Sequence, residues 1–340
     1  MRLTLLAMVL VGISAPHWTP QTSGVTATFR GVSAVSDTVA WASGSGSTVL
    51  RTADGGATWQ KLTVTTDRLD FRDVDAIDEK TAYVLSIGNG PTSRIFKTTD
   101  AGVTWTQQFK ADDQKVFLDA MTFWDADHGI VMGDSIDGHF FVLTTENGGG
   151  AWSRVPDAAL PPALPNEGAF AGSGTNIAVW GASDAWIGTS GSRVLHTPDR
   201  GKTWSVAATP IPSNDSTGIF SVAFRDALHG VAVGGDFKQE AVAADNLAIT
   251  RDGGQSWLLV KSQSSASTAQ YLSGFRSVVR YVPGTTALIA VGPQGSDWSD
   301  DDGRSWIALG PPGFHTFDFA PGGKVGWGAG GRGQIGRFER

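Results

Sequence analysis

The stretch "TRDGGQSW" at Thr250–Trp257 decides the fold because its pattern occurs six times in the chain. The other copies are "TADGGATW" (Thr52–Trp59), "TTDAGVTW" (Thr98–Trp105), "TENGGGAW" (Thr145–Trp152), "TPDRGKTW" (Thr197–Trp204) and "SDDDGRSW" (Ser299–Trp306). We call the shared pattern, Ser/Thr-x-Asp-x-Gly-x-x-Trp, the turn box. Its tryptophans are spaced at about 46, 47, 52, 53 and 49 residues, which is typical of a chain built from one repeated supersecondary unit.

The residue types of the turn box indicate a tight β-turn. The Asp oxygens can accept backbone N–H groups inside the turn, and Gly can take a positive φ there. The hydroxyl can hold the incoming strand, while Trp packs between neighbouring units. We therefore predict a structural role for the acidic or amide residue of every box, namely Asp54, Asp100, Asn147, Asp199, Asp252 and Asp301.

Short strand-like runs surround each box, as in residues 71–77, 81–88, 93–99 and 104–109. Four strands per unit at this period predict a β-propeller. After Trp306 the chain has room for only three more strands, so the fourth must come from the N-terminal stretch around Trp18. The sequence predicts an all-β fold, a seven-bladed β-propeller of four-stranded antiparallel blades. An N-terminal strand closes the last blade, and residues 16–340 form one domain.

Composition restricts the functional classes. The formal net charge of −7 argues against a general nucleic-acid binder, which needs a basic face. The absence of cysteine excludes disulfides and thiolate zinc sites. Residues 1–15 hold one arginine followed by an apolar run that ends in small residues, and this pattern predicts a signal peptide. We expect a periplasmic or secreted protein.

The boxes resemble those of the BNR, or Asp-box, repeat superfamily of propellers. The likeness is greatest to bacterial relatives of the photosystem II stability and assembly factors, and it covers essentially the whole chain. It includes the stretches 167–179, 218–236 and 291–306 ("EGAFAGSGTNIAV", "GIFSVAFRDALHGVAVGGD" and "VGPQGSDWSDDDGRSW"). Such relatives often carry the label "oxidoreductase" without any established chemistry. The resemblance implies a propeller that contacts a protein partner and needs no cofactor.

Enzyme signatures are weak by comparison. Gly328, Gly330 and Gly333 form a GxGxxG pattern, but a predicted strand follows it where a dinucleotide site needs a helix. A glycan-acting hydrolase, sialidase-like or xyloglucanase-like, would need two facing carboxyl groups. Loop acids exist for this role, among them Asp297, but the sequence does not show that any two approach one another. The acidic run Asp300–Asp302 lies within a box and offers too few donors for a calcium loop, so no metal is predicted.

The candidate binding residues lie on the face opposite the boxes. "FRGVSAV", "FRDVDAI" and "FRSVVRY" align Arg30, Arg72 and Arg276 at the start of three innermost strands, and His315 falls beside this register in the last blade. Arginines here could clamp an anion. Alternatively, each could pair with a nearby acid such as Asp70, Asp73 or Asp318. Loops expected on the same face add Asp134, Glu167, Asn176 and Asp236.

These observations predict a non-catalytic binding or scaffold protein that assists a protein or peptide partner through the face opposite the boxes. The ligand could be an anionic group or a glycan, and envelope association is expected, but no nucleic acid. The alternative is a glycan-acting hydrolase. Two acids that converge in a deep channel pocket would favour the enzyme, and an arginine-rich surface would favour the binder.

Overall fold

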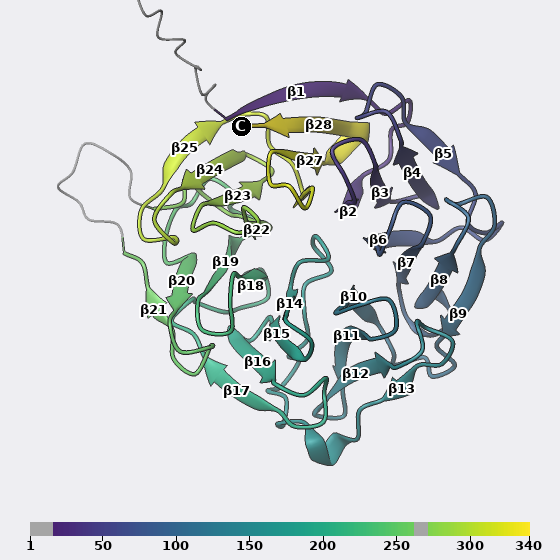
Figure 1. The fold of residues 1–340 in the computed structure, drawn as a ribbon. Coiled ribbons are helices and arrows are strands. Elements are labelled where there is room, and N and C mark those ends of the chain that lie inside the picture. The colour runs from purple at the N-terminus through teal and green to yellow at the C-terminus, as the bar shows by residue number, and fades with distance from the viewer. Residues whose placement is uncertain (1–15, 262–270) are drawn as a thin grey trace, which may run out of the picture.

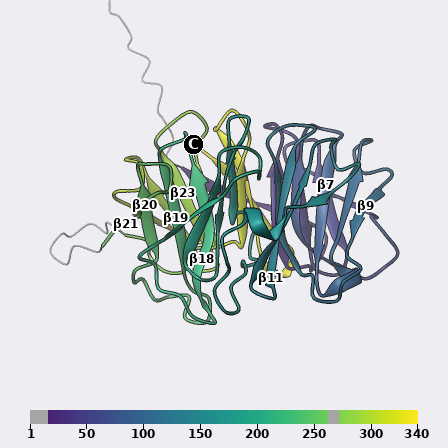
Figure 2. The ribbon, with the colours of Figure 1, turned by 90° about the horizontal axis from the view of Figure 1, so that it is seen from below.

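The chain forms a ring of seven sheets around a central channel (Figure 1). A computed structural model describes residues 16–261 and 271–340. The predicted signal peptide, 1–15, lies outside the described residues. Each sheet holds four antiparallel strands, and in six of the seven they follow sequence order from the channel outwards; in the seventh, β1 lies outside β28. The predicted seven-bladed β-propeller is therefore confirmed. Figure 2, at right angles to Figure 1, shows the strands running between two faces covered by loops.

The strands fall into seven blades. Blade 1 contains β2 (Phe29–Ala34), β3 (Ala40–Gly44), β4 (Thr48–Thr52) and β5 (Gln60–Leu62), and blade 2 contains β6 (Asp70–Ala76), β7 (Ala82–Ile87), β8 (Arg94–Thr98) and β9 (Thr106–Lys110). Blade 3 contains β10 (Leu118–Phe123), β11 (Gly129–Ile136), β12 (His139–Thr145) and β13 (Ser153–Arg154). Blade 4 contains β14 (Ile177–Trp180), β15 (Asp184–Gly188), β16 (Arg193–Thr197) and β17 (Ser205–Ala208). Blade 5 contains β18 (Thr217–Phe224), β19 (Gly230–Asp236), β20 (Leu247–Thr250) and β21 (Leu258–Leu259). Blade 6 contains β22 (Val278–Tyr281), β23 (Leu288–Gly292), β24 (Gly295–Ser299) and β25 (Ile307–Gly310). Blade 7 contains β26 (Thr316–Phe319), β27 (Val325–Ala329), β28 (Gln334–Glu339) and β1 (His17–Thr22).

Helical structure in the described residues is limited to three short 3₁₀ turns: Gly90–Thr92, Asp157–Ala159 and Gly331–Gly333. The last of these occupies the GxGxxG stretch and leads directly into β28, so no helix follows these glycines. No helix in the part of the chain that the structure describes is long and apolar enough to cross a membrane.

The N-terminal strand closes the ring, as predicted. β1 pairs with β28 in antiparallel register from His17 opposite Glu339 to Thr22 opposite Gln334. The Trp18 ring packs against Phe314 at 4.6 Å and Phe338 at 5.1 Å between centroids. Blade 7 therefore combines both ends of the described chain, and its apolar contacts hold the two ends together.

The turn boxes have the hydrogen bonds of a turn clamp. In the fifth box, Asp252 Oδ1 accepts the N–H of Ser256 at 3.0 Å and Oδ2 accepts the Ser256 hydroxyl. Thr250 Oγ1 accepts the N–H of Gly254 at 2.9 Å. Gly254 has φ +88°, and Trp186 of the preceding blade lies 3.2 Å from where a Cβ would stand. Glycine is therefore required both for the conformation and for the blade contact.

The third box explains why Asn147 can replace the acid. Asn147 Oδ1 still accepts a backbone N–H, that of Ala151, at 2.8 Å. In the other five boxes the equivalent of Ala151 carries a hydroxyl that donates to the second carboxylate oxygen: Thr58, Thr104, Thr203, Ser256 and Ser305. An amide suffices where that hydroxyl is missing, because only one acceptor is then needed.

Side chains of one blade cap the channel-facing edge of the next. An innermost strand presents N–H groups that no further strand can accept. Ser33 Oγ accepts the N–H of Ala76, and Asp318 Oδ2 accepts that of Ala34, each at 3.0 Å. The apolar clusters likewise join neighbouring blades, so the core forms a ring between the sheets.

The clamp predicts that Asp252→Ala lowers stability by about 1 kcal/mol, as loss of a comparable side-chain cap does. Asp252→Asn should cost less because one acceptor remains. Urea unfolding followed by tryptophan fluorescence would measure both changes. A matching loss of ligand affinity in Asp252→Ala would contradict a purely structural role for this box.

Candidate functional site

A segment from blade 4 closes the central channel. We call Gly168–Thr175, which precedes β14, the plug, and Figure 1 shows it reaching the middle of the ring. Ser173 Oγ donates to the Ser277 carbonyl of blade 6 at 2.8 Å, and the Thr316 hydroxyl of blade 7 donates to the Ser173 carbonyl at 3.1 Å. Blades 6 and 7 thus hold a loop that originates in blade 4.

Above the plug lies a cavity of about 400 Å³, which we call the mouth cavity. It opens where the innermost strands begin. In an up-and-down blade the turn boxes join the third and fourth strands at the opposite face, so the cavity and the boxes lie at opposite ends. The cavity is lined by Arg30, Arg72, Ile87, Phe117, Asp119, Asp134, Ala169, Phe170, Ala171, Gly172, Phe220, Phe237, Glu240, Phe275, Pro293 and His315.

Arg30 and Arg72 form the cationic side of the cavity. Arg30 Nη1 donates to the Gly172 carbonyl at 3.3 Å, and Arg72 Nη1 donates to the Ala171 carbonyl at 3.1 Å. Arg72 Nε also pairs with Asp70 at 2.9 Å. Arg30 has no carboxylate partner within ion-pair distance among the described residues, and its Nε has no hydrogen-bond acceptor there. Burial, and then the Arg72 charge, lower the pKa of Arg30 to about 10, so it stays protonated at neutral pH.

His315 occupies the equivalent position in blade 7 and lines the same cavity. Its Nδ1 lies 3.2 Å from the Phe29 carbonyl. Burial, followed by the Arg30 charge, lowers the pKa of His315 to about 4. His315 is therefore neutral at pH 7 and adds a polar ring but no charge.

The prediction that Arg276 joins this group is wrong. Its side chain is 1 % exposed, and its Nε pairs with Asp297, itself fully buried, at 2.6 Å. Arg30 and Arg72 lie four residues before the ends of their strands, Ala34 and Ala76, whereas Arg276 lies five before Tyr281. A shift of one residue reverses the side of a strand on which a side chain lies. Arg276 accordingly takes the buried position that Phe29 and Phe71 hold in blades 1 and 2.

Two buried acids line the wall beside the plug. Asp119 is 1 % exposed, and its Oδ2 has no hydrogen-bond partner in the described chain. Burial raises the pKa of Asp119 well above its usual value, and the nearby Asp134 carboxyl adds to the effect. Burial also raises the pKa of Asp134. Both acids line the mouth cavity together with Ala169 of the plug.

Aromatic side chains line the side of the cavity opposite blades 1 and 2, which carry the two arginines. We call Phe170, Phe220, Phe237 and Phe275 the aromatic wall. Phe170 of the plug stacks on Phe220 with centroids 3.9 Å apart, and Phe275 meets Phe220 edge-on at 4.7 Å. Phe237 lies 6.0 Å from Phe220 and is 39 % exposed.

The other predicted residues have different positions. Glu167 is buried just before the plug, where it pairs with Arg193 and accepts the Thr189 hydroxyl at 2.6 Å. Asn176 is fully buried at the end of the plug. Asp236 lies at the start of the loop that carries Phe237, and it accepts the Lys238 N–H at 2.8 Å. None of these three lines the mouth cavity, while Asp134 does.

Most of the cavity was not predicted from the sequence, although the register of the innermost strands contains a signal that finds part of it. Counting four residues back from the end of the innermost strand reaches a lining residue in five blades: Arg30, Arg72, Asp119, Phe220 and His315. In four of these blades the counted residue sits at a β-bulge of the innermost pair. Phe170, Phe237 and Phe275 lie on loops, where no strand register identifies them.

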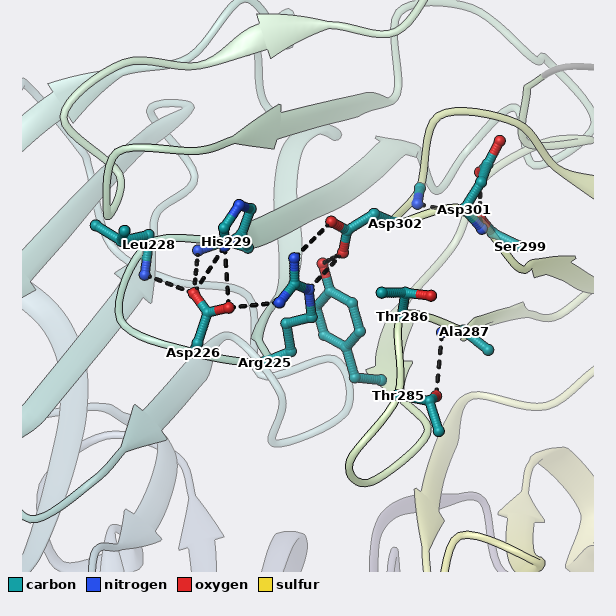
Figure 3. Close-up of polar contacts among 12 residues, drawn as sticks. Arg225, Asp226, Leu228, His229, Thr285, Thr286, Ala287, Ser299, Asp301 and Asp302 are labelled. Carbon is teal, nitrogen blue, oxygen red and sulfur yellow. Dashed lines mark hydrogen bonds and ion pairs between the residues drawn. The ribbon is translucent and has the colours of Figure 1, made fainter.

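The acidic run Asp300–Asp302 is engaged in contacts within the fold. Asp302 receives Arg225 Nε and Nη2 at 2.8 Å each and the Tyr281 hydroxyl at 3.0 Å, so it ties blade 5 to blade 6 (Figure 3). Asp300 accepts the Trp298 indole N–H at 2.8 Å. Within 16–261 and 271–340, no group of three acidic, histidine or cysteine residues is placed to hold a metal ion.

The fold and this cavity define a seven-bladed propeller with a closed channel and one charged, aromatic mouth. Solved structures of similar fold include "YCF48 bound to D1 peptide" (TM-score 0.66, 17 % identity, 95 % of this chain and 97 % of that one). YCF48 from Cyanidioschyzon merolae has a TM-score of 0.63 at 17 % identity, over 95 % and 98 %. The GH74 xyloglucanase from Xanthomonas campestris has 0.61 at 16 % identity, over 95 % of this chain and 53 % of its own. No family model matches the chain, and no curated protein does.

Burial of the Arg276–Asp297 pair predicts that Arg276→Ala destabilises the protein by roughly 3–5 kcal/mol, because an uncompensated buried carboxylate remains. The double variant Arg276→Met/Asp297→Leu should recover much of this loss. Urea unfolding measures both. An unchanged midpoint in Arg276→Ala would show that the guanidinium is not buried against Asp297.

Asp73, beneath the plug, predicts a pH dependence. It is 4 % exposed, and burial raises its pKa to about 7. The folded protein therefore retains a proton that the unfolded chain releases near pH 4, and its stability falls as pH rises from about 4 to about 7. Asp73→Asn lacks this titration. The unfolding free energy of the wild type relative to Asp73→Asn should thus be lower at pH 8 than at pH 5, and a constant difference would contradict the shift.

Proposed function

We propose that the chain is a non-catalytic binding protein that takes a segment of a partner protein into the mouth cavity through a carboxylate of that segment. The observation that carries the proposal is that Arg30 and Arg72, from neighbouring blades, line one cavity whose inner end the plug closes. The plug carbonyls of Gly172 and Ala171 hold the two guanidinium groups in place. Arg30 keeps donors without a carboxylate partner, as a site for an incoming anion requires.

Two likenesses, one of sequence pattern and one of fold, support this role. The repeat pattern resembles that of the photosystem II assembly-factor group, and one solved structure of similar fold is that of YCF48 bound to a D1 peptide. We also propose that the protein is periplasmic or secreted and that it assists the assembly or stability of an envelope-associated partner.

A glycan-acting hydrolase is the second candidate because Asp119 and Asp134 meet at the cavity and a xyloglucanase shares the fold. Glycosidases place their two carboxyl groups on either side of the bond, about 5–9.5 Å apart. Here Asp119 is only 1 % exposed, whereas hydrolysis of a glycosidic bond needs both carboxyl groups accessible to the sugar. This arrangement favours a binding role over hydrolysis.

The proposal predicts that Arg30→Ala/Arg72→Ala lowers partner affinity at least tenfold. Each lost charge-assisted hydrogen bond is worth about 1.5–3 kcal/mol, and 1.4 kcal/mol is tenfold. Envelope extracts would be passed over immobilised wild type and variant, and captured proteins compared by mass spectrometry. Their affinities would then be measured with purified partner.

The matched control is Arg251→Ala/Arg304→Ala, which removes the same charge from positions in the turn boxes, on the opposite face. It should retain the partner. Equal capture by both double variants would overturn the proposal. Cleavage of a glycan panel by the wild type, abolished in Asp119→Asn or Asp134→Asn, would establish the hydrolase instead.

A further inference from the structure

The mouth cavity has two chemically different sides that face one ligand. On one side stand the guanidinium groups of Arg30 and Arg72, and on the other stands the aromatic wall. Both sides border the same space of about 400 Å³. A ligand that fills this space must present a negative group and an apolar group close together.

The aromatic wall is open to a ligand on one edge. Phe170, Phe220 and Phe275 pack against one another, but Phe237 stands at their margin with 39 % of its surface exposed. Exposed apolar side chains that gather at a cavity mark a binding surface, and aromatic rings give large contact area at low entropic cost.

The plug makes the cavity a dead end. Its carbonyls accept hydrogen bonds from both arginines, and Ser173 anchors it to blades 6 and 7. A polypeptide that enters between the arginines and the aromatic wall therefore cannot pass through the channel. The end of a chain fits such a cavity better than an internal segment, which would have to turn and leave by the same opening.

The charges also limit the anion. Glu240 lines the same space as the two arginines. A phosphate would bring two negative charges beside Glu240, whereas a carboxylate brings only one to Arg30 and Arg72. An α-carboxylate and the side chain of the same residue leave one Cα, so a terminal residue presents a negative group and an apolar group close together.

We infer that the mouth cavity binds the free carboxyl terminus of a partner chain whose last residue is apolar, with the carboxylate at Arg30 and Arg72 and the side chain on the aromatic wall. This inference rests on the proposed function and specifies its ligand. It makes the aromatic wall the specificity-determining part of the site and the arginines the part that holds any carboxyl terminus.

Four fluorescein-labelled Gly/Ser hexapeptides would test this by fluorescence anisotropy. The first ends in leucine with a free carboxylate, the second in leucine amide, and the third in serine with a free carboxylate. The fourth ends in an amide and carries its carboxylate on an internal glutamate. The leucine acid should bind at least tenfold more tightly than each of the others. Equal binding of the leucine amide or of the internal glutamate would overturn the terminal carboxylate. Equal binding of the serine acid would overturn the apolar selection.

Variants separate the two sides of the cavity. Phe237→Ala, at a half-exposed position that leaves the fold intact, should remove the preference for leucine over serine and leave the serine acid unaffected. Arg30→Ala should weaken both acids. The control Leu228→Ala removes an apolar side chain, 53 % exposed, from the box face and should change neither. A preference that survives Phe237→Ala would overturn the role of the aromatic wall.

The inference and the proposed function fail in distinguishable ways. If none of the peptides binds while wild type, but not Arg30→Ala/Arg72→Ala, still captures a partner, the inference is wrong and the proposed function stands. If peptide binding and partner capture are both unchanged in Arg30→Ala/Arg72→Ala, the proposed function is wrong as well.

Discussion

Closure of the ring is the constraint on which the rest of the structure depends. A propeller with an unpaired last blade would expose the edge of β28 and leave the blade 7 core open to water. β1 satisfies both needs, since it pairs with β28 along its whole length and brings Trp18 against Phe314 and Phe338. Only in a closed ring does blade 7 lie beside blade 1, so ring closure brings His315 to the cavity next to Arg30. Arg30 and Arg72 come from consecutive blades and supply the cationic side.

Within the closed ring, the register of the innermost strands decides which side chains reach the channel mouth. Bulges in the innermost pairs of blades 1, 2, 3 and 5 turn Arg30, Arg72, Asp119 and Phe220 towards the cavity, while their predecessors stay in the core. Blade 7 has no such shift, and its His315 still lines the cavity. In blade 6, Arg276 lies one residue further from the end of its strand than Arg30 and Arg72 do, so it points into the protein, where it pairs with Asp297. One residue of register separates a ligand-facing arginine from a buried ion pair.

The plug turns an open channel into a closed cavity and supplies part of its surface. Gly172 and Ala171 offer their carbonyl groups to the arginines, and Phe170 extends the aromatic wall. Ala169 lines the cavity beside Asp119 and Asp134, and burial raises the pKa of both acids. One short loop from blade 4 therefore sets the depth, polarity and shape of the site.

Local sequence contained most of the fold. The turn boxes predicted the turns, their period predicted four-stranded blades, and the missing strand after Trp306 predicted that Trp18 would close the ring. These features depend on neighbours in sequence, where hydrogen-bonding and packing preferences act directly. The sequence also predicted Arg30 and Arg72 at the channel mouth, but it did not predict the exclusion of Arg276, because the one-residue offset of β22 depends on where that strand pairs.

The remaining parts of the site were decided only by the tertiary structure. Phe170, Phe237 and Phe275 lie on loops with no common spacing, and Glu167 resembled a ligand residue until its buried pairing with Arg193 was visible. The repeated turns, the blades and the closing strand could be predicted from the sequence, because each is specified by contacts within one unit or by the count of units. The tertiary structure decided the cavity, because its walls come from six blades and a plug that meet only once the ring has closed.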